Sequence, residues 1–109
     1  MSKYIVFFSY SSAAVKGMID HPSDRSAAVR ELATSLGGSV ESVYWMQGNH
    51  DGFVIGEFPD SVSVAAVSAA VAATGAVSSI ETHEIFDHDQ QEQIVKAAKT
   101  ALQAYTPPN

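Results

Sequence analysis

The sequence predicts a protein of the α+β class, in which strands and helices follow one another in the order β-α-β-β-α-β and a further helix comes last. Three observations predict this class. Short apolar runs rich in aromatic and β-branched residues alternate with segments whose apolar residues recur at helical spacing. Glycine, proline and helix-capping residue types stand at nearly every boundary between these segments. The length of 109 residues suits one domain, residues 1–109, and excludes two separate cores.

The first third of the chain contains one expected strand and one clear helix. Residues 4–10 form an apolar and aromatic run, and both faces of this strand are largely apolar, which predicts a central strand that is covered on both sides. A short helical turn is expected within residues 11–20. The helix after it begins at Ser23 or Asp24, carries an apolar stripe and ends at Gly37.

The middle of the chain predicts a β-hairpin. Residues 40–46 are rich in Val, Tyr and Trp, and residues 53–58 form a second strand-like run. The residues between them, Gln47 to His50, are a turn signal. Because the connection is only a few residues long, the two strands are expected to pair antiparallel.

The last third predicts a helix, a strand and a second helix. Residues 61–74 are dominated by Ala and Val, and Gly75 ends this helix. The fourth strand is expected at residues 77–86. Asp87 caps the last helix, whose apolar residues recur every three or four positions up to Tyr105.

This order of elements is that of the ferredoxin-like split βαβ motif. With right-handed crossovers, the strands are expected in the spatial order 4-1-3-2, with two helices on one face of the sheet and the other face open. We expect the first and third strands to run parallel and the fourth to run antiparallel to the first. The turn before the third strand and the end of the fourth strand would then meet at one edge of the sheet.

Composition and charge exclude several classes of protein. Six basic against 12 acidic residues give a net charge of −6, which disfavours nucleic acids as partners. No apolar run is long enough to span a membrane. With no cysteine, disulfide scaffolds, cysteine-based metal sites and thiol nucleophiles are excluded. The apolar run near the N-terminus is too short for a signal peptide, so a cytoplasmic location is expected.

Several stretches of the chain together resemble a known family. They are Lys3–Tyr10, Val29–Gly38, Glu41–Tyr44, Gly48–Asp51, Gly56–Asp60 and Thr74–Val77. Over roughly residues 3–95 the chain resembles the GYD domain family, although His50 stands where the family name implies Tyr. The resemblance implies a ferredoxin-like domain of the dimeric α+β barrel type, and it implies no reaction.

The expected topology gathers polar residues at one edge of the sheet. His50 and Asp51 precede the third strand, and His83 and Glu84 lie near the end of the fourth. A few polar groups beside aromatic surface are typical of a ligand site. The candidate binding residues are His50, Asp51, Glu57, His83, Trp45 and Tyr44. The alternative is a polar rim around a dimer interface, which requires the same residue types.

Each polar candidate also has a structural interpretation. Asp51 in a turn commonly accepts hydrogen bonds from nearby backbone N–H groups. Glu57 alternates with Phe53 and Ile55, so it is either a partly buried acid–base group or a strand-end carboxylate that reaches water or a partner chain. Two imidazoles and a carboxylate suit a divalent metal, but no tight ligand motif occurs, and we expect neither a metal nor another cofactor.

The open sheet face predicts a homodimer, because an uncovered aromatic face exceeds the apolar patch that a soluble monomer usually exposes. The last helix competes for that face, since it could fold back over it. Two functions remain open. One is a small-molecule-binding or interaction and regulatory module, with a small apolar or aromatic ligand. The other is a small cofactor-free enzyme that uses a carboxylate or His in a cleft as general base. No nucleophile triad, phosphate loop or nucleotide fingerprint is present.

Overall fold

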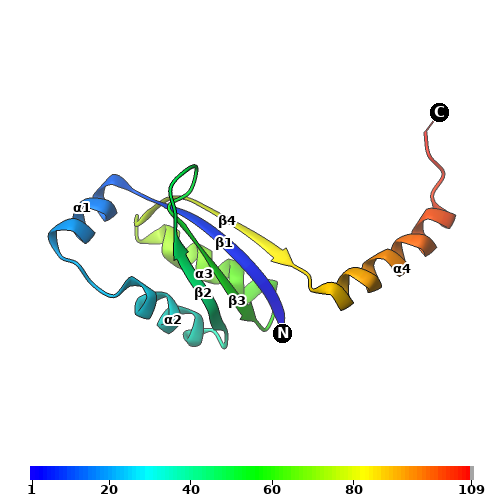
Figure 1. Ribbon diagram of the computed structural model, residues 1–109, viewed down its shortest axis with the longest axis horizontal. Coiled ribbons are helices and arrows are strands. Elements are labelled where there is room, and N and C mark those ends of the chain that lie inside the picture. The colour runs from blue at the N-terminus through cyan, green and yellow to red at the C-terminus, as the bar shows by residue number, and fades with distance from the viewer. Residues whose placement is uncertain (109) are drawn as a thin grey trace.

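A computed structural model describes residues 1–108 as a four-stranded sheet with four helices (Figure 1). Asn109, the last residue of the expected domain, lies outside the described residues. The strands are β1 (Ser2–Tyr10), β2 (Ser39–Trp45), β3 (Gly52–Phe58) and β4 (Val77–Ile85). The helices are α1 (Ser12–Asp20), α2 (Arg25–Ser35), α3 (Ser61–Ala73) and α4 (His88–Ala104). These elements form a ferredoxin-like α+β fold with α1 and α4 added to it.

The sheet has the order β2-β3-β1-β4, and all neighbouring strands pair antiparallel. The spatial order and the β2–β3 hairpin are therefore confirmed. The predicted parallel arrangement of β1 and β3 is wrong, because Phe58 lies opposite Ser2 and Gly52 lies opposite Phe8. The chain crosses from β1 to β2 through α2, which makes these two strands parallel, and the short hairpin then reverses its direction.

The antiparallel pairing also separates the two segments that were expected to share an edge. Gly52 at the start of β3 lies opposite Phe8, near the end of β1. Ile85 at the end of β4 lies opposite Lys3, near the start of β1. The turn before β3 and the end of β4 are therefore at opposite ends of the sheet.

The helices α2 and α3 cover one face of the sheet, and the core lies beneath them. Tyr4, Val6 and Phe8 of β1 are buried there, together with Ala33 of α2 and Val64 of α3. The central position of β1 is confirmed. Its expected cover on both sides is not seen within one chain, because the alternate residues of this strand are only half-buried.

We call the uncovered side the open face and define it by Ile5, Phe7, Tyr44, Phe53 and Ile55. Ile5 pairs with Ile55, and Phe7 pairs with Phe53, whose ring lies 6.0 Å from that of Phe7. Tyr44 stacks on Phe53 at a centroid distance of 5.6 Å. Within the described residues 1–108, no helix packs on this face (Figure 1). It is a continuous surface of aromatic and branched aliphatic side chains.

The helix starts follow the capping residues that the sequence predicts. The side chains of Asp24, Asp60 and Asp87 each accept a hydrogen bond from a backbone N–H of the first turn. The N–H of Ala27 lowers the pKa of the Asp24 carboxyl, and that of Ser63 lowers the pKa of the Asp60 carboxyl. The segment after β1 forms a regular helix, α1, rather than a single turn.

Helix α4 projects away from the rest of the molecule and packs on no other element (Figure 1). It does not fold back over the open face. The apolar stripe predicted for it is present but exposed, with 40% of Ile94, 56% of Val95 and 74% of Leu102 accessible to solvent. Within residues 1–108, no helix combines the length and the apolar character needed to cross a membrane.

Candidate functional site

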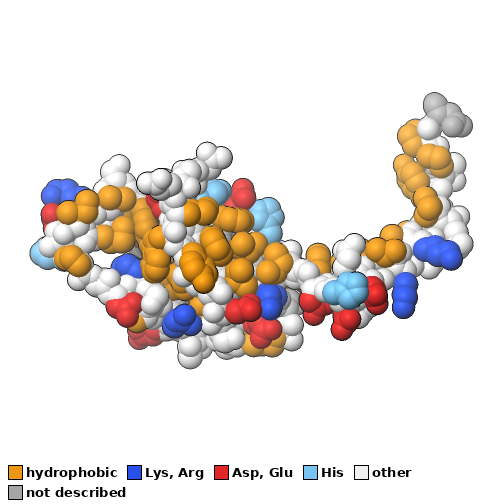
Figure 2. All heavy atoms as spheres, viewed as in Figure 1, with side chains coloured by type: hydrophobic (Ala, Val, Ile, Leu, Met, Phe, Trp, Pro, Cys, Tyr) orange, Lys and Arg blue, Asp and Glu red, His pale blue; other side chains and the backbone are white. Residues whose placement is uncertain are grey.

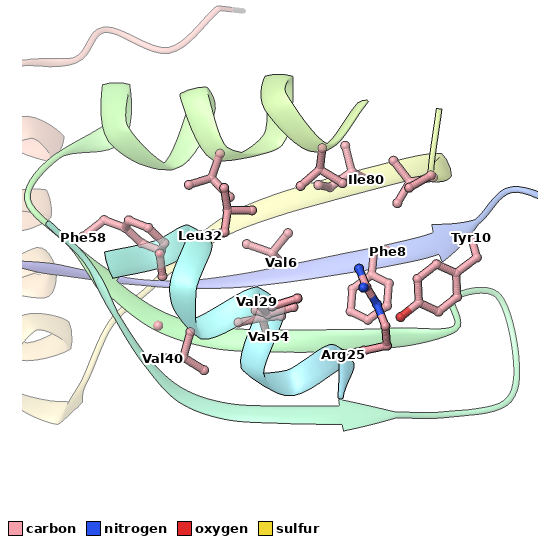
Figure 3. A pocket seen from close by; sticks show the side chains of 17 residues that line it. Val6, Phe8, Tyr10, Arg25, Val29, Leu32, Val40, Val54, Phe58 and Ile80 are labelled. Carbon is pink, nitrogen blue, oxygen red and sulfur yellow. The ribbon is translucent and has the colours of Figure 1, made fainter. Parts of the chain in front are cut away.

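An apolar cavity of about 140 Å³ lies between the sheet and the helices α2 and α3 (Figure 3). Its walls are branched aliphatic and aromatic side chains of the sheet and of both helices. The central ones are Val6, Val54 and Ile80 from the sheet, Val29 and Leu32 from α2, and Val67 from α3. Protein interiors contain few voids larger than a water molecule. A cavity of this size and lining is therefore suited to a small apolar molecule.

Small residues on both sides of the cavity explain why it is open. Ala28 and Ala33 face it from α2, and Gly56 faces it from β3. Gly56 cannot carry a side chain, because a Cβ atom there would lie 2.8 Å from the backbone oxygen of Ser39. Helix α3, which is built largely of Ala and Val, contributes little further volume. The side chains on this face are thus too small to fill the space between the layers.

Two polar side chains, Tyr10 and Arg25, lie at one end of the cavity (Figure 3). The indole Nε1–H of Trp45 donates a hydrogen bond to the Tyr10 hydroxyl at 3.1 Å. A second hollow of about 260 Å³ borders α1, and its lining shares Tyr10, Arg25 and Ala76 with the cavity. These residues therefore lie where the two spaces meet.

Sequence reasoning did not identify Arg25 as a site residue, although a signal was present. Arg25, Val29 and Leu32 stand at spacings of four and three residues, which places them on one face of α2. The first turn of α2 thus places the cationic side chain of Arg25 on the helix face where the later turns place Val29 and Leu32. Such a position can hold the polar end of a ligand whose apolar part lies deeper.

The predicted site histidines come together, but on the open face rather than at an edge of the sheet. The rings of His50 and His83 lie 5.3 Å and 6.3 Å from the ring of Phe7. His83 Nε2 is 3.0 Å from a carboxylate oxygen of Glu81, and this contact lowers the pKa of the Glu81 carboxyl. The loop before β3 lies beside the end of β1, where the Ser9 hydroxyl donates a hydrogen bond to the Asn49 backbone oxygen, and this brings the His50 ring to Phe7.

The other predicted site residues are dispersed. Asp51 accepts a hydrogen bond at 2.8 Å from the backbone N–H of Tyr10, which belongs to β1 and not to the turn that contains Asp51. Glu57 is exposed and lies opposite Lys3, whose ammonium pairs with Glu41 at 3.1 Å. Tyr44 and Trp45 are consecutive in β2 and point to opposite faces of the sheet. The structure therefore does not gather the six candidates into one pocket.

The same residues are also poorly placed for a metal. Across residues 1–108, no group of three or more His, Asp or Glu side chains is arranged to hold a metal ion. His88, the first residue of α4, contacts Glu92 of the same helix at 3.1 Å.

Replacing Asp51 with Ala is expected to lower the free energy of unfolding by about 1–3 kcal/mol, because the half-buried Tyr10 amide loses its acceptor. The loss is measured by urea denaturation followed by circular dichroism. His50→Ala is the matched control. The His50 ring packs on Phe7, and its 3.4 Å contact is with the Ser9 hydroxyl and not with a backbone N–H. Equal stability losses in the two variants would contradict the structural role of Asp51.

Comparison with known proteins identifies a family and solved structures of similar fold. The family model of the GYD domain matches residues 4–95. No curated protein matches the sequence. Among solved structures, the chain is similar to the one titled "Crystal Structure of MtbAldR", with a TM-score of 0.53 and 14% sequence identity. The alignment covers 80% of this chain and 53% of that chain, so this chain spans about half its length. At such an identity the likeness concerns the fold alone.

Proposed function

The chain belongs to the GYD domain family, and we propose that it is a homodimeric, cytoplasmic module that binds small apolar or aromatic molecules. The apolar cavity between the sheet and the helices α2 and α3 carries this proposal. An engineered apolar cavity of about 150 Å³ in another protein takes up benzene. The cavity of about 140 Å³ in this protein is of the same size and has a similar lining.

The proposal of a homodimer is supported by the amount of exposed surface. The chain exposes 7437 Å², whereas a compact monomer of 11.6 kDa is expected to expose about 5,800 Å². Its radius of gyration is 17.5 Å, against about 13 Å for a compact chain of this length. Two copies that bury the excess would hide about 3,200 Å², which falls within the range of stable homodimers.

The exposed surface that such a dimer would bury has an apolar character in two places. Figure 2 shows hydrophobic side chains gathered over the sheet and again along α4. Packing two open faces against each other would bury the first set, and packing α4 on the partner would bury the second. A second copy of this chain is thus the partner we propose, and with a net charge of −6 we propose neither a nucleic acid nor a membrane surface.

The alternative function, a cofactor-free enzyme, has less support. The cavity is lined by none of His50, Asp51, Glu57 and His83, which are the candidate bases. The contact between His83 and Glu81 lies on the open face, at 55% exposure of both side chains. A general base needs a substrate held beside it. Within one chain, the arrangement favours binding in the cavity over catalysis.

The binding function is tested by adding benzene to protein with isotopically labelled methyl groups. We expect shifts in the methyl resonances of Val6, Val29 and Ile80, because these side chains line the cavity. The methyl groups of Val95 and Leu102 in α4 are the matched control and should not move, since they are apolar but exposed. Native mass spectrometry of freshly purified protein reports a retained ligand and the dimer together. Equal shifts in both sets of methyl groups, or none in either, would contradict the proposed cavity site.

A further inference from the structure

We propose that the cavity binds a small monocarboxylate, with its apolar body among the aliphatic side chains and its carboxylate held by Arg25 and Tyr10. This inference rests on the proposed binding function and deepens it by naming the class of ligand. It depends on three features of the site. They are the unpaired charge of Arg25, the free donor of Tyr10 and the division of the space into an apolar inner part and an outer part that opens to a second hollow.

Arg25 carries a charge that no acidic side chain neutralises among residues 1–108. None of the salt bridges of this region includes it. The adjacent carboxylate, that of Asp24, is already engaged, because it accepts hydrogen bonds from the Ala27 N–H and the Ser26 hydroxyl. In a chain with twice as many acidic as basic residues, an unpaired Arg at the end of an apolar cavity is complementary to an anion.

The other basic side chains are placed elsewhere. Lys3 pairs with Glu41, Lys16 pairs with Asp20, and Arg30 donates to the backbone oxygen of Val40. The remaining lysines belong to α4, which does not contact the cavity. Arg25 is therefore the one basic side chain that lines the cavity within the described part of the chain.

Tyr10 supplies a second donor at the same end of the cavity. Its hydroxyl oxygen accepts a hydrogen bond from Trp45 Nε1–H at 3.1 Å. A phenol has one hydrogen to donate, and no described side chain or backbone atom accepts it. A guanidinium presents a fork of donors that fits the two oxygens of a carboxylate. The guanidinium of Arg25 and the hydroxyl of Tyr10 are thus hydrogen-bond donors for which the described residues supply no acceptor side chain.

The shape of the site selects a ligand with one polar end. The inner part, beyond Phe8, is lined by Val29, Val54 and other aliphatic side chains, and a charged group there would be desolvated without a partner (Figure 3). The outer part opens to the hollow of about 260 Å³ beside α1, where a carboxylate keeps contact with water. An aromatic ring or a short branched chain that carries one carboxylate satisfies both parts, and a dicarboxylate or an amine does not.

The experiment compares the binding of phenylacetate and phenylethylamine, which share an aromatic ring and carry opposite charges. Affinities are measured by calorimetry on the full chain. We expect phenylacetate to bind at least about tenfold more tightly than the amine. Arg25→Gln is expected to weaken phenylacetate binding at least about tenfold, which is the effect of losing a charge-assisted hydrogen bond. Arg30→Gln, which removes the same charge from the same helix, is the matched control and should bind phenylacetate as the native chain does.

The outcomes separate this inference from the function on which it rests. If benzene binds in the cavity but Arg25→Gln and Arg30→Gln bind phenylacetate equally well, the carboxylate site is refuted and the binding module stands. If neither phenylacetate nor benzene binds, both proposals are overturned. Tyr10→Phe gives an independent test, since loss of the hydroxyl should weaken phenylacetate binding and leave benzene binding unchanged. Circular dichroism of each variant excludes unfolding as the cause.

Discussion

A Phe7→Asp variant is expected to be a monomer with a mass near 11.6 kDa, whereas the native chain is expected to have about twice that mass. Phe7 lies at the centre of the open face, between Phe53 and the rings of His50 and His83. A carboxylate there would be desolvated without a partner when two open faces meet. The few residues that dominate an interface cluster near its centre, and truncating one of them costs about 2 kcal/mol or more of binding free energy. Light scattering coupled to size-exclusion chromatography measures the two masses.

Val62→Asp is the control for this experiment. Val62 is an apolar residue of α3 that is 74% exposed, and α3 covers the other side of the sheet. The variant is expected to remain a dimer. Ile55→Asp, a second change on the open face, guards against a folding defect that is peculiar to Phe7. A native chain of monomer mass, or a dimer that persists in both open-face variants, would refute the proposed assembly.

The second large effect is expected in a Gly52→Ala variant, which should lose about 2 kcal/mol or more of its free energy of unfolding. A Cβ atom at this position would lie 2.6 Å from the backbone oxygen of Tyr44 and 2.5 Å from the Phe8 ring. The first neighbour belongs to the paired strand β2, so it cannot move without breaking the hairpin register. Urea denaturation measures the loss as a shift of the midpoint.

Gly17→Ala is the matched control for Gly52. The same methyl group at position 17 would meet no atom within 4 Å, and the position lies inside helix α1. Alanine in a helix interior is favoured over glycine by roughly 0.5–1 kcal/mol, so this variant should be as stable as the native chain or slightly more stable. If Gly52→Ala and Gly17→Ala lost the same free energy of unfolding, Tyr44 and Phe8 would not lie close to Gly52 in solution.

The fold could be predicted largely from the sequence, because the signals that determine its elements are local. Asp24, Asp60 and Asp87 cap helices through groups that lie within three residues of them, so their residue types alone indicate the helix starts. The relative direction of β1 and β3 was predicted wrongly. The crossover through α2 makes β2 parallel to β1, and the hairpin that follows makes β3 antiparallel to both strands.

The candidate site was harder to predict, because a cavity is determined by volumes that the sequence does not place in space. Its walls come from six elements of secondary structure. That Ala28, Gly56 and Val71 line one cavity is evident only from their positions in space. The proximity of His50 and His83 was expected, but its cause was different. Both rings lie beside Phe7, and the periodicity of the sequence does not indicate that the loop before β3 places His50 there.

The hydrogen bond between Trp45 and Tyr10 has an optical consequence. The chain contains a single tryptophan, so all of its indole emission arises from one known place. That indole donates its N–H to the phenol at the end of the cavity, and the wavelength of indole emission depends on the polarity and hydrogen bonding around the ring. If the cavity binds the proposed ligand, the surroundings of Tyr10 are expected to change and, through its hydrogen bond, those of Trp45. Tryptophan fluorescence is therefore the expected readout of binding at the proposed site, in dilute solution and without a dye.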